Sequence, residues 1–380
     1  MSTELAERLD AIQLIDHHVH SVLATSPDRA DFEQLITESD RPAPAGTTQF
    51  DSQVGFAIRR HCGARLGLDP DATADEYWTR RTSFPEAELV RRFLGGAGVD
   101  HWLVDSGWDG GRLLPLDQLR NQVTGRVGEI LRLETLLETV AAGATASTLH
   151  RDFVTALTEA QPGVVGLKSI VAYRYGFDFE PDCPSESEIR QAAGRWLATA
   201  AASGPFRVDD PVLLRMLLWE GVRTGLPLQL HAGYGDPDLE LHRCDPLLLT
   251  RWIKAVEPTG TKLMLLHCYP FHRNAGFLAH AFPHVYLDVG LTVNYTGAAS
   301  AAVIRESLEL APFAKILYSS DAWGPPELHF LGARLWRRGI TAVLAEWVAA
   351  GEWSTTDAIR VATMIGRSNA ERVYGLADDE

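Results

Sequence analysis

Residues 210–231, DPVLLRMLLWEGVRTGLPLQLH, decide the fold class. The stretch over 210–224 has the apolar spacing of a helix, and PLQLH at 227–231 is a short apolar run that follows a turn. The pair predicts a helix followed directly by a buried strand. This order is the repeating unit of an α/β fold.

Similar apolar runs recur on both sides of this unit. They predict strands over 12–16, 100–105, 126–133, 164–171, 227–231, 262–267, 284–290 and 315–320. Helix-like stretches separate many of them, over 186–202, 210–224, 246–257 and 300–311. Eight alternating units predict a parallel sheet with right-handed crossovers, closed into a distorted (β/α)8 TIM barrel that occupies the single domain 1–380. The third strand has an alternative, because RVGEILRLETLL (126–137) also fits the start of a helix.

The connection after the first strand is far longer than an ordinary strand-to-helix loop. Residues 21–99 contain helix-like pieces around 53–66, 73–82 and 85–94. Barrel active sites lie at the carboxyl ends of the strands, which is where this connection begins. We therefore expect 21–99 to form a helical cap that covers the chemistry and excludes water.

Composition and charge exclude several classes of protein. Hydrophobic residues make up 46% of the 380 residues and charged residues 22%, which is ordinary for a globular protein. The formal charge of −15 gives no electrostatic support for nucleic acid or an anionic membrane as a partner. The four cysteines form no CxxC pair, and the start resembles no signal peptide. We expect a cytoplasmic protein with a small-molecule substrate, and the sequence leaves assembly into a homo-oligomer open.

Polar side chains stand at the predicted strand ends. His18 and His20 are two residues apart, so strand alternation sends both rings to one face, although such a pair alone is also common in packing or on surfaces. Further polar residues occupy corresponding ends of other strands: Lys168, His231, His267 and Asp321. Taken singly, His231 fits a core histidine and Asp321 a helix N-cap. Together they are the ligand set of a hydrolytic zinc ion or another divalent ion.

These motifs resemble the amidohydrolase superfamily, in particular its amidohydrolase-related branch, over nearly the whole chain. The matching stretches are IDHHVH (15–20), GLKSIVAYR (166–174), LQLHAGYGDPDLEL (228–241), LLHCYPFHRNAGFLA (265–279) and ILYSSDAWGPPE (316–327). The likeness is greatest to the barrel that is fused to glutamine synthetase in some fungal development proteins and plant nodulins. It implies metal bound by His18, His20, His231 and Asp321.

The resemblance also implies two versions of the centre. In one-metal members, the position of His267 is a catalytic histidine. In two-metal members, the lysine at the position of Lys168 is carboxylated and bridges the ions, with His231 and His267 on the second ion. We predict the binuclear form, because a plain lysine beside two cations is electrostatically costly. The alternative is that Lys168 binds a substrate anion next to one ion.

Other residues near these strand ends are candidates for substrate binding. Arg174 offers a bidentate grip for a carboxylate, with Tyr173 beside it. His242 lies in the polar loop after the fifth strand, and Trp323 follows Asp321 as a candidate pocket wall. Packing or solvent exposure are the alternatives for these side chains.

The function that follows is metal-assisted hydrolysis of a C–N bond in a small amide that carries a carboxylate. The resemblance to a barrel fused to glutamine synthetase suggests, by association only, a γ-glutamyl-like substrate. Asp321 would take a proton from the attacking water, and His267 would stabilise the oxyanion or hold a second ion. A nonoxidative decarboxylase, a lactonase or a hydratase fits the same ligands. A non-enzymatic scaffold is disfavoured, because every ligand position is occupied by a metal-binding type of residue.

Overall fold

The computed structural model describes residues 3–107, 111–204 and 206–376. Within these residues one parallel sheet has seven strands in sequential order. The strands are β1 (Leu14–Val19), β2 (Val99–Asp105), β3 (Arg126–Arg132), β4 (Gly166–Ser169), β5 (Leu228–Ala232), β6 (Leu263–His267) and β7 (Val285–Leu287). Sequential order with helical crossovers curls the sheet toward a barrel, as the sequence predicted.

The eighth predicted strand is the main departure. Residues 315–320 form no regular strand, although Ile316 makes a single parallel bridge with Leu287 of β7. On the other side, the amide of His17 donates to the carbonyl of Tyr318 at 3.2 Å, so this segment joins both edges of the sheet. The amide of Ser320 donates to the Asp16 carboxylate at 3.0 Å instead of to a backbone carbonyl. That side-chain partner interrupts the ladder, so the barrel closes through an irregular segment.

Helices follow the strands in the order that the sequence indicated. They are α7 (Leu116–Arg120), α8 (Leu133–Ala141), α9 (Leu149–Ala160), α10 (Val171–Arg174), α11 (Glu186–Ser203), α12 (Pro211–Arg223), α13 (Thr250–Val256), α14 (His272–Ala281), α15 (Gly290–Thr296) and α16 (Ser300–Ser307). In α12, Asp210 caps the first turn by accepting from the amide of Val212, and the leucine-rich face is buried. Helix α8 begins directly after β3, so the segment 126–137 contains both the strand and the helix that the sequence left open.

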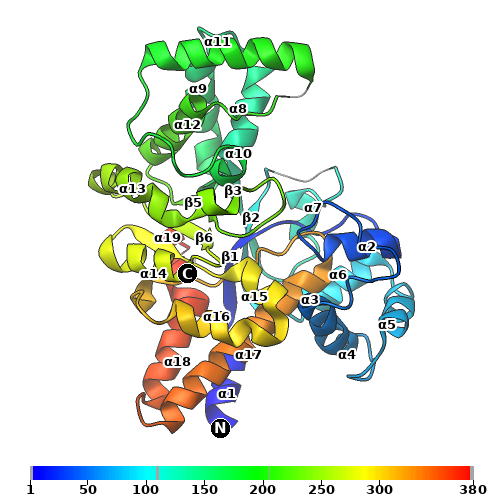
Figure 1. The fold of residues 1–380 in the computed structure, drawn as a ribbon. Helices are drawn as coiled ribbons and strands as arrows, with labels where there is room; N and C mark the ends of the chain where they lie inside the picture. Colours follow the sequence, from blue (N-terminus) through cyan, green and yellow to red (C-terminus); the bar gives the residue numbers. More distant parts are fainter. Residues whose placement is uncertain (1–2, 108–110, 205, 377–380) are drawn as a thin grey trace.

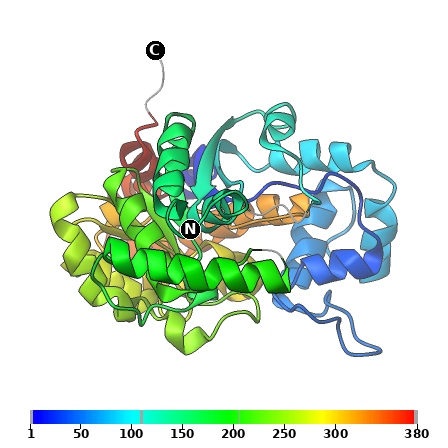
Figure 2. The same cartoon turned by 90° about the horizontal axis from the view of Figure 1, so that it is seen from above.

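The connection over 21–99 is helical, with α2 (Arg29–Leu35), α3 (Gln53–Ala57), a π-turn (Ile58–Cys62), α4 (Gly63–Arg65), α5 (Ala74–Arg81) and α6 (Glu86–Leu94). Figures 1 and 2 show these blue-to-cyan helices on one side of the molecule, away from the yellow-green α13 and α14. Helix α6 packs against α17 (Pro326–Ala349), which follows the irregular eighth segment. The remaining helices are α1 (Thr3–Asp10), α18 (Thr355–Thr363) and α19 (Asn369–Tyr374). Within the described residues, none of the helices combines the length and apolar character needed to cross a membrane.

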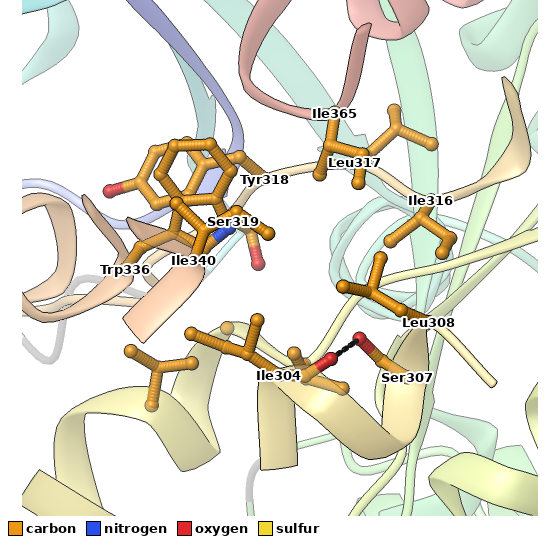
Figure 3. Close-up of a pocket in the computed structure, with 13 residues that line it drawn as sticks. Ile304, Ser307, Leu308, Ile316, Leu317, Tyr318, Ser319, Trp336, Ile340 and Ile365 are labelled. Carbon is orange, nitrogen blue, oxygen red and sulfur yellow. Dashed lines mark hydrogen bonds between the residues drawn. The ribbon is translucent and has the colours of Figure 1, made fainter. Parts of the chain in front are cut away.

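A small internal void lies behind the irregular segment. Figure 3 shows Ile304, Trp336 and Ile340 around it, with Tyr318 and Ser319 at its edge. Its volume is roughly 10 Å³, which is close to the minimum for one water molecule. The hydroxyls of Tyr318 and Ser319 are buried without a hydrogen-bond partner among the described residues. The void shares no lining residue with the strand-end cavity described below.

A buried ion network fastens the 21–99 segment to α17. Arg81, only 1% exposed, donates from Nε to Glu327 at 2.7 Å and from Nη2 to Glu86 at 2.8 Å. The hydroxyl of Tyr77 donates to the same Glu327 carboxylate at 3.0 Å. Glu327 lies in the first turn of α17, six residues after Asp321. The network thus ties the helical segment to the helix that follows a predicted metal ligand in the chain.

Arg81→Met is expected to lower the free energy of unfolding by about 3–5 kcal/mol, because it leaves two carboxylates buried without their cation. Urea unfolding followed by circular dichroism measures this effect. Arg91→Met is the matched control, since Arg91 on α6 is 58% exposed and pairs only with Glu88 at the surface. The control should change stability by less than about 1 kcal/mol. Equal stability losses in both variants would show that the buried network is not what fastens the segment.

Candidate metal centre

His18, His20 and Asp321 converge at the end of β1. Asp321 Oδ1 lies 2.9 Å from His18 Nε2 and 3.6 Å from His20 Nε2. One ligand atom from each residue lies within 4.8 Å of the other two, a spacing that suits a single metal ion. The HxH spacing and the residue after the eighth segment therefore meet, as the strand-end argument predicted.

His267 and His231 extend this group from β6 and β5. His267 Nε2 lies 3.2 Å from Asp321 Oδ2, and the ring centroids of His231 and His267 are 4.8 Å apart. The backbones of His267 and Asp321 have φ values of 62° and 48°, in the left-handed region that residues other than glycine seldom adopt. Such strain is typical of functional sites, where the surrounding structure holds side chains in a required direction.

Local backbone geometry also shapes the loop after β5. Gly233, two residues beyond His231, has a φ of 76°, and a Cβ there would lie 2.3 Å from the carbonyl oxygen of Tyr269. Only glycine permits both the left-handed backbone and this close approach. The turn allows the chain to leave the sheet directly after the histidine.

Burial sets the charge states of these groups. It lowers the pKa of His18 to about 3, with Lys168 adding to the effect, and it holds the pKa of His231 well below its ordinary value. Burial alone would raise the pKa of Asp321, but the imidazoles of His267 and His18 keep it well below its usual range. Lowered pKa values of His18, His231 and Asp321 favour metal binding, because a metal ligand must be deprotonated.

A second layer of hydrogen bonds orients the rings. His18 Nδ1 lies 2.8 Å from Gln229 Oε1, and Gln229 Nε2 donates to the hydroxyl of Tyr374 at 2.9 Å. Because an amide oxygen only accepts, His18 carries its proton on Nδ1 and presents the Nε2 lone pair to the centre. Asp288 accepts from the backbone amide of His267 at 3.0 Å. Neither Gln229 nor Asp288 was expected from the sequence, although Gln229 stands two residues before His231 on the same strand.

Lys168 is buried beside the candidate ligands. Its Nζ lies 3.2 Å from His18 Nε2, and burial lowers its pKa to about 8. Asp105 lies close enough to favour the cationic form, but its carboxylate already pairs with Arg132 Nη2 at 2.6 Å. Lys168 thus lies where either a bridging carbamate or a substrate-binding amine would act.

A cavity of about 620 Å³ opens above this centre. His20, Lys168, His231 and Asp321 line it, together with Tyr173, Arg174, Trp323 and residues 34, 35 and 37–40 of the helical segment. The structure does not bring His242 into this lining: its side chain is exposed, and its role in substrate binding remains a prediction. The side-chain alternation of a strand does not predict where a side chain points in the loop that follows. His242 lies in a short 3-10 turn, where it is exposed. Cys268 is buried and donates to the carbonyl of Leu265, which agrees with a structural thiol.

The residues present fit a metal ion. His231 Nε2 and His267 Nε2 are buried with no hydrogen-bond partner among the described residues, and an unpaired buried nitrogen is costly. Both belong to side chains of the same cluster as Asp321. A divalent ion bound by this set would satisfy these lone pairs.

Comparisons with known proteins agree with this geometry. The amidohydrolase family model matches residues 172–376, more than half of the chain. Protein fluG of Emericella nidulans is 28% identical over 96% of this chain and 46% of its own length, so the chain spans about half of that relative. A candidate metal-dependent hydrolase from Lactobacillus casei ATCC 334 has 28% identity and a TM-score of 0.85 over 98% of this chain and 97% of its own.

A uronate isomerase from Bacillus halodurans C-125 shares the fold, with 14% identity and a TM-score of 0.66 over 98% of this chain and 95% of its own. At that identity the likeness concerns the fold alone. The predicted barrel and the predicted family are both confirmed. By the family match and the arrangement of its strands, this chain belongs to the amidohydrolase family.

Proposed function

We propose that the protein hydrolyses the C–N bond of a small amide that carries a carboxylate, with a divalent metal ion held by His18, His20, His231 and Asp321. The observation that carries the proposal is the meeting of three ligand-type side chains at the floor of a substrate-sized cavity. Membership of the amidohydrolase family supports metal-dependent hydrolysis in general. Zinc is the expected ion, because imidazole and carboxylate ligands suit it.

The chain's own residues supply the proton transfers. A bound divalent ion would polarise the scissile carbonyl and make water a better nucleophile. Asp321, ionised and 9% exposed, is placed to take the proton that water loses as it adds to the carbonyl carbon. The same proton then passes to the leaving nitrogen as the C–N bond breaks, so that an acid and a free amine are formed.

His267 has a role beside Asp321. Its Nε2 lies 3.2 Å from Asp321 Oδ2 and is buried. In the one-metal form of the site, this nitrogen would stabilise negative charge on the carbonyl oxygen. In the two-metal form, it would be a ligand to the second ion. Residues 34, 35 and 37–40 line the cavity, which supports the proposed role of the 21–99 segment as a cap.

Arg174 is the proposed partner of the substrate carboxylate. Its side chain is 9% exposed and lines the cavity, and its Nη1 lies 3.1 Å from Glu138. The Nε of Arg174 is buried without a hydrogen-bond partner among the described residues. A guanidinium in this state has donors available for a bidentate contact with a carboxylate.

The test uses the metal-loaded protein with glutaryl-p-nitroanilide, and follows the colour of released p-nitroaniline. Arg174→Lys keeps the positive charge but loses the planar guanidinium that makes two parallel hydrogen bonds to a carboxylate. The value of kcat/KM should therefore fall about 10- to 100-fold, mainly through a higher KM. Arg207→Lys is the control, because Arg207 also lines the cavity but is 52% exposed and already pairs with Asp238. A panel of lactones and carboxylic acids, with carbon dioxide release followed in parallel, covers the other reactions of the family. Carbon dioxide release without amine release from any amide would contradict the proposal.

A further inference from the structure

The cavity wall contains both signs of charge. The guanidinium groups of Arg132, Arg174 and Arg207 belong to its lining. So do several carboxylates outside the candidate metal centre: Asp31, Glu38, Asp40, Asp236 and Asp238. A cavity for a simple carboxylate would need only the guanidinium side. The acidic side therefore calls for a separate explanation.

Most of these carboxylates have cationic partners. Asp31 pairs with Arg112, and Asp238 pairs with Arg207 at 2.9 Å. Asp40 lies 3.6 Å from Arg41 and is 57% exposed, so water also screens it. Asp236 has no ion pair within 4.0 Å among the described residues either, but it accepts from the backbone amide of Asp238 at 2.9 Å and Arg207 acts on it electrostatically. Glu38 likewise has no Lys, Arg or His within 4.0 Å among the described residues, and burial contributes most to the rise of its pKa.

The surroundings of Glu38 are anionic and aromatic. Burial and the carboxylates of Asp321 and Asp236 raise the pKa of Glu38 to about 8. Burial and the charge of Glu38 raise the pKa of Tyr295, whose ring lies 5.9 Å from that of Tyr234 in an edge-to-face arrangement. A carboxyl group flanked by tyrosine rings is a setting that favours an ammonium ion, by charge and by cation–π attraction. A bound ammonium would lower the pKa of Glu38 again.

Tyr173 connects this carboxyl group with the anion-binding side. It is the neighbour of Arg174 in the chain, it lines the cavity, and its hydroxyl interacts electrostatically with Glu38. Arg174 lines the same cavity, and its Nε is buried without a hydrogen-bond partner among the described residues. A guanidinium and a carboxyl group therefore line one cavity together with Tyr173.

We infer that Glu38 is a substrate-binding residue for an ammonium group, so that the cavity takes a zwitterionic amide of the amino-acid type. Arg174 binds its carboxylate and Glu38 binds its ammonium group. This inference rests on the proposed function for the bond that is cleaved, but it concerns binding and can be tested apart from hydrolysis. Because Glu38 comes from the 21–99 segment, that segment contributes to specificity as well as covering the site.

Titration calorimetry with the metal-loaded protein compares L-glutamate with glutarate, which differ only in the ammonium group. The native protein should bind L-glutamate about tenfold more tightly, the usual effect of a charge-assisted contact. Glu38→Gln should bring the ratio close to one while leaving glutarate binding unchanged. Asp40→Asn removes a nearby exposed carboxylate of the same segment and should preserve the ratio. Equal binding of both ligands by the native protein, a preserved ratio in Glu38→Gln, or no binding of either ligand at millimolar concentration would overturn the inference.

The hydrolytic counterpart separates this inference from the proposed function. It compares γ-glutamyl-p-nitroanilide with glutaryl-p-nitroanilide, again a pair that differs only in the ammonium group. The native protein should favour the γ-glutamyl compound about tenfold in kcat/KM, and Glu38→Gln should lose that preference. A binding preference for L-glutamate without cleavage of either anilide would contradict the proposed function and still support the role of Glu38. Cleavage of both anilides at equal rates would contradict the role of Glu38 alone.

Discussion

Alanine in place of His18 is expected to remove bound metal and to lower kcat/KM by about 10³-fold or more, because the ligand set and the carbonyl polarisation are lost together. His18 is fully buried, and its Nε2 faces Asp321 at 2.9 Å. Gln229 fixes the ring from the other side, so no neighbouring side chain can easily take its place. Elemental analysis after dialysis gives the metal content, and p-nitroaniline release gives the activity.

His231→Ala should give the same joint loss, since His231 Nε2 is buried and unpaired beside the same cluster. His284→Ala is the matched control. His284 is another buried histidine, 6% exposed, but it precedes β7 and lies 3.2 Å from the carbonyl of Ile253. The control should keep its metal. Retention of a full metal equivalent in both His18→Ala and His231→Ala would reject the ligand assignment.

The strand ends were predictable from the sequence because parallel strands place their carboxyl ends at one edge of the sheet. The alternation of side chains along a strand was enough to predict that His18 and His20 share a face. The position of Asp321 followed from the return of the chain beside β1. The position of Gln229 could also be predicted, since it shares a face with His231. A glutamine in an apolar strand, however, does not by itself indicate a metal site. Recognising it requires the observation that it holds His18 Nδ1.

Other features depend on tertiary contacts that have no local signal. The eighth segment has the composition of a strand, but Asp16 accepts the Ser320 amide and so interrupts the ladder. Glu38 lies in a polar stretch with no periodicity, and only the tertiary structure shows that it lines the cavity. His242 lies in a polar loop after β5, where its side chain is exposed, whereas Asp236 and Asp238 of the same loop line the cavity.

Lys168→Ala is expected to cost about one metal equivalent, with most of the activity, because we predict that a carbamate on Lys168 bridges two ions. The amine lies 3.2 Å from His18 Nε2 and is only 2% exposed, so an ammonium group there would lie against any ion that His18 binds. Burial lowers the pKa of this amine to about 8, which favours the neutral form that reacts with carbon dioxide. Conversion to an anionic carbamate turns this repulsion into attraction.

The rescue experiment separates this prediction from the alternative in which Lys168 binds a substrate anion. A short carboxylic acid such as propionate fills the space of the missing side chain and supplies the bridging oxygens, so it should restore part of both metal and activity in Lys168→Ala. Lys262→Ala is the control, because Lys262 precedes β6 at its amino end and donates to the carbonyl of Val373. This variant should keep its full metal content. Native protein exchanged with ¹³C-bicarbonate should show a carbamate carbon by NMR that Lys168→Ala lacks. A single ion at full occupancy in Lys168→Ala, with weaker binding of glutarate and no response to propionate, would instead assign the lysine to the substrate. The two outcomes cannot coincide, because a bridging group holds metal in the absence of substrate and a substrate-binding amine does not.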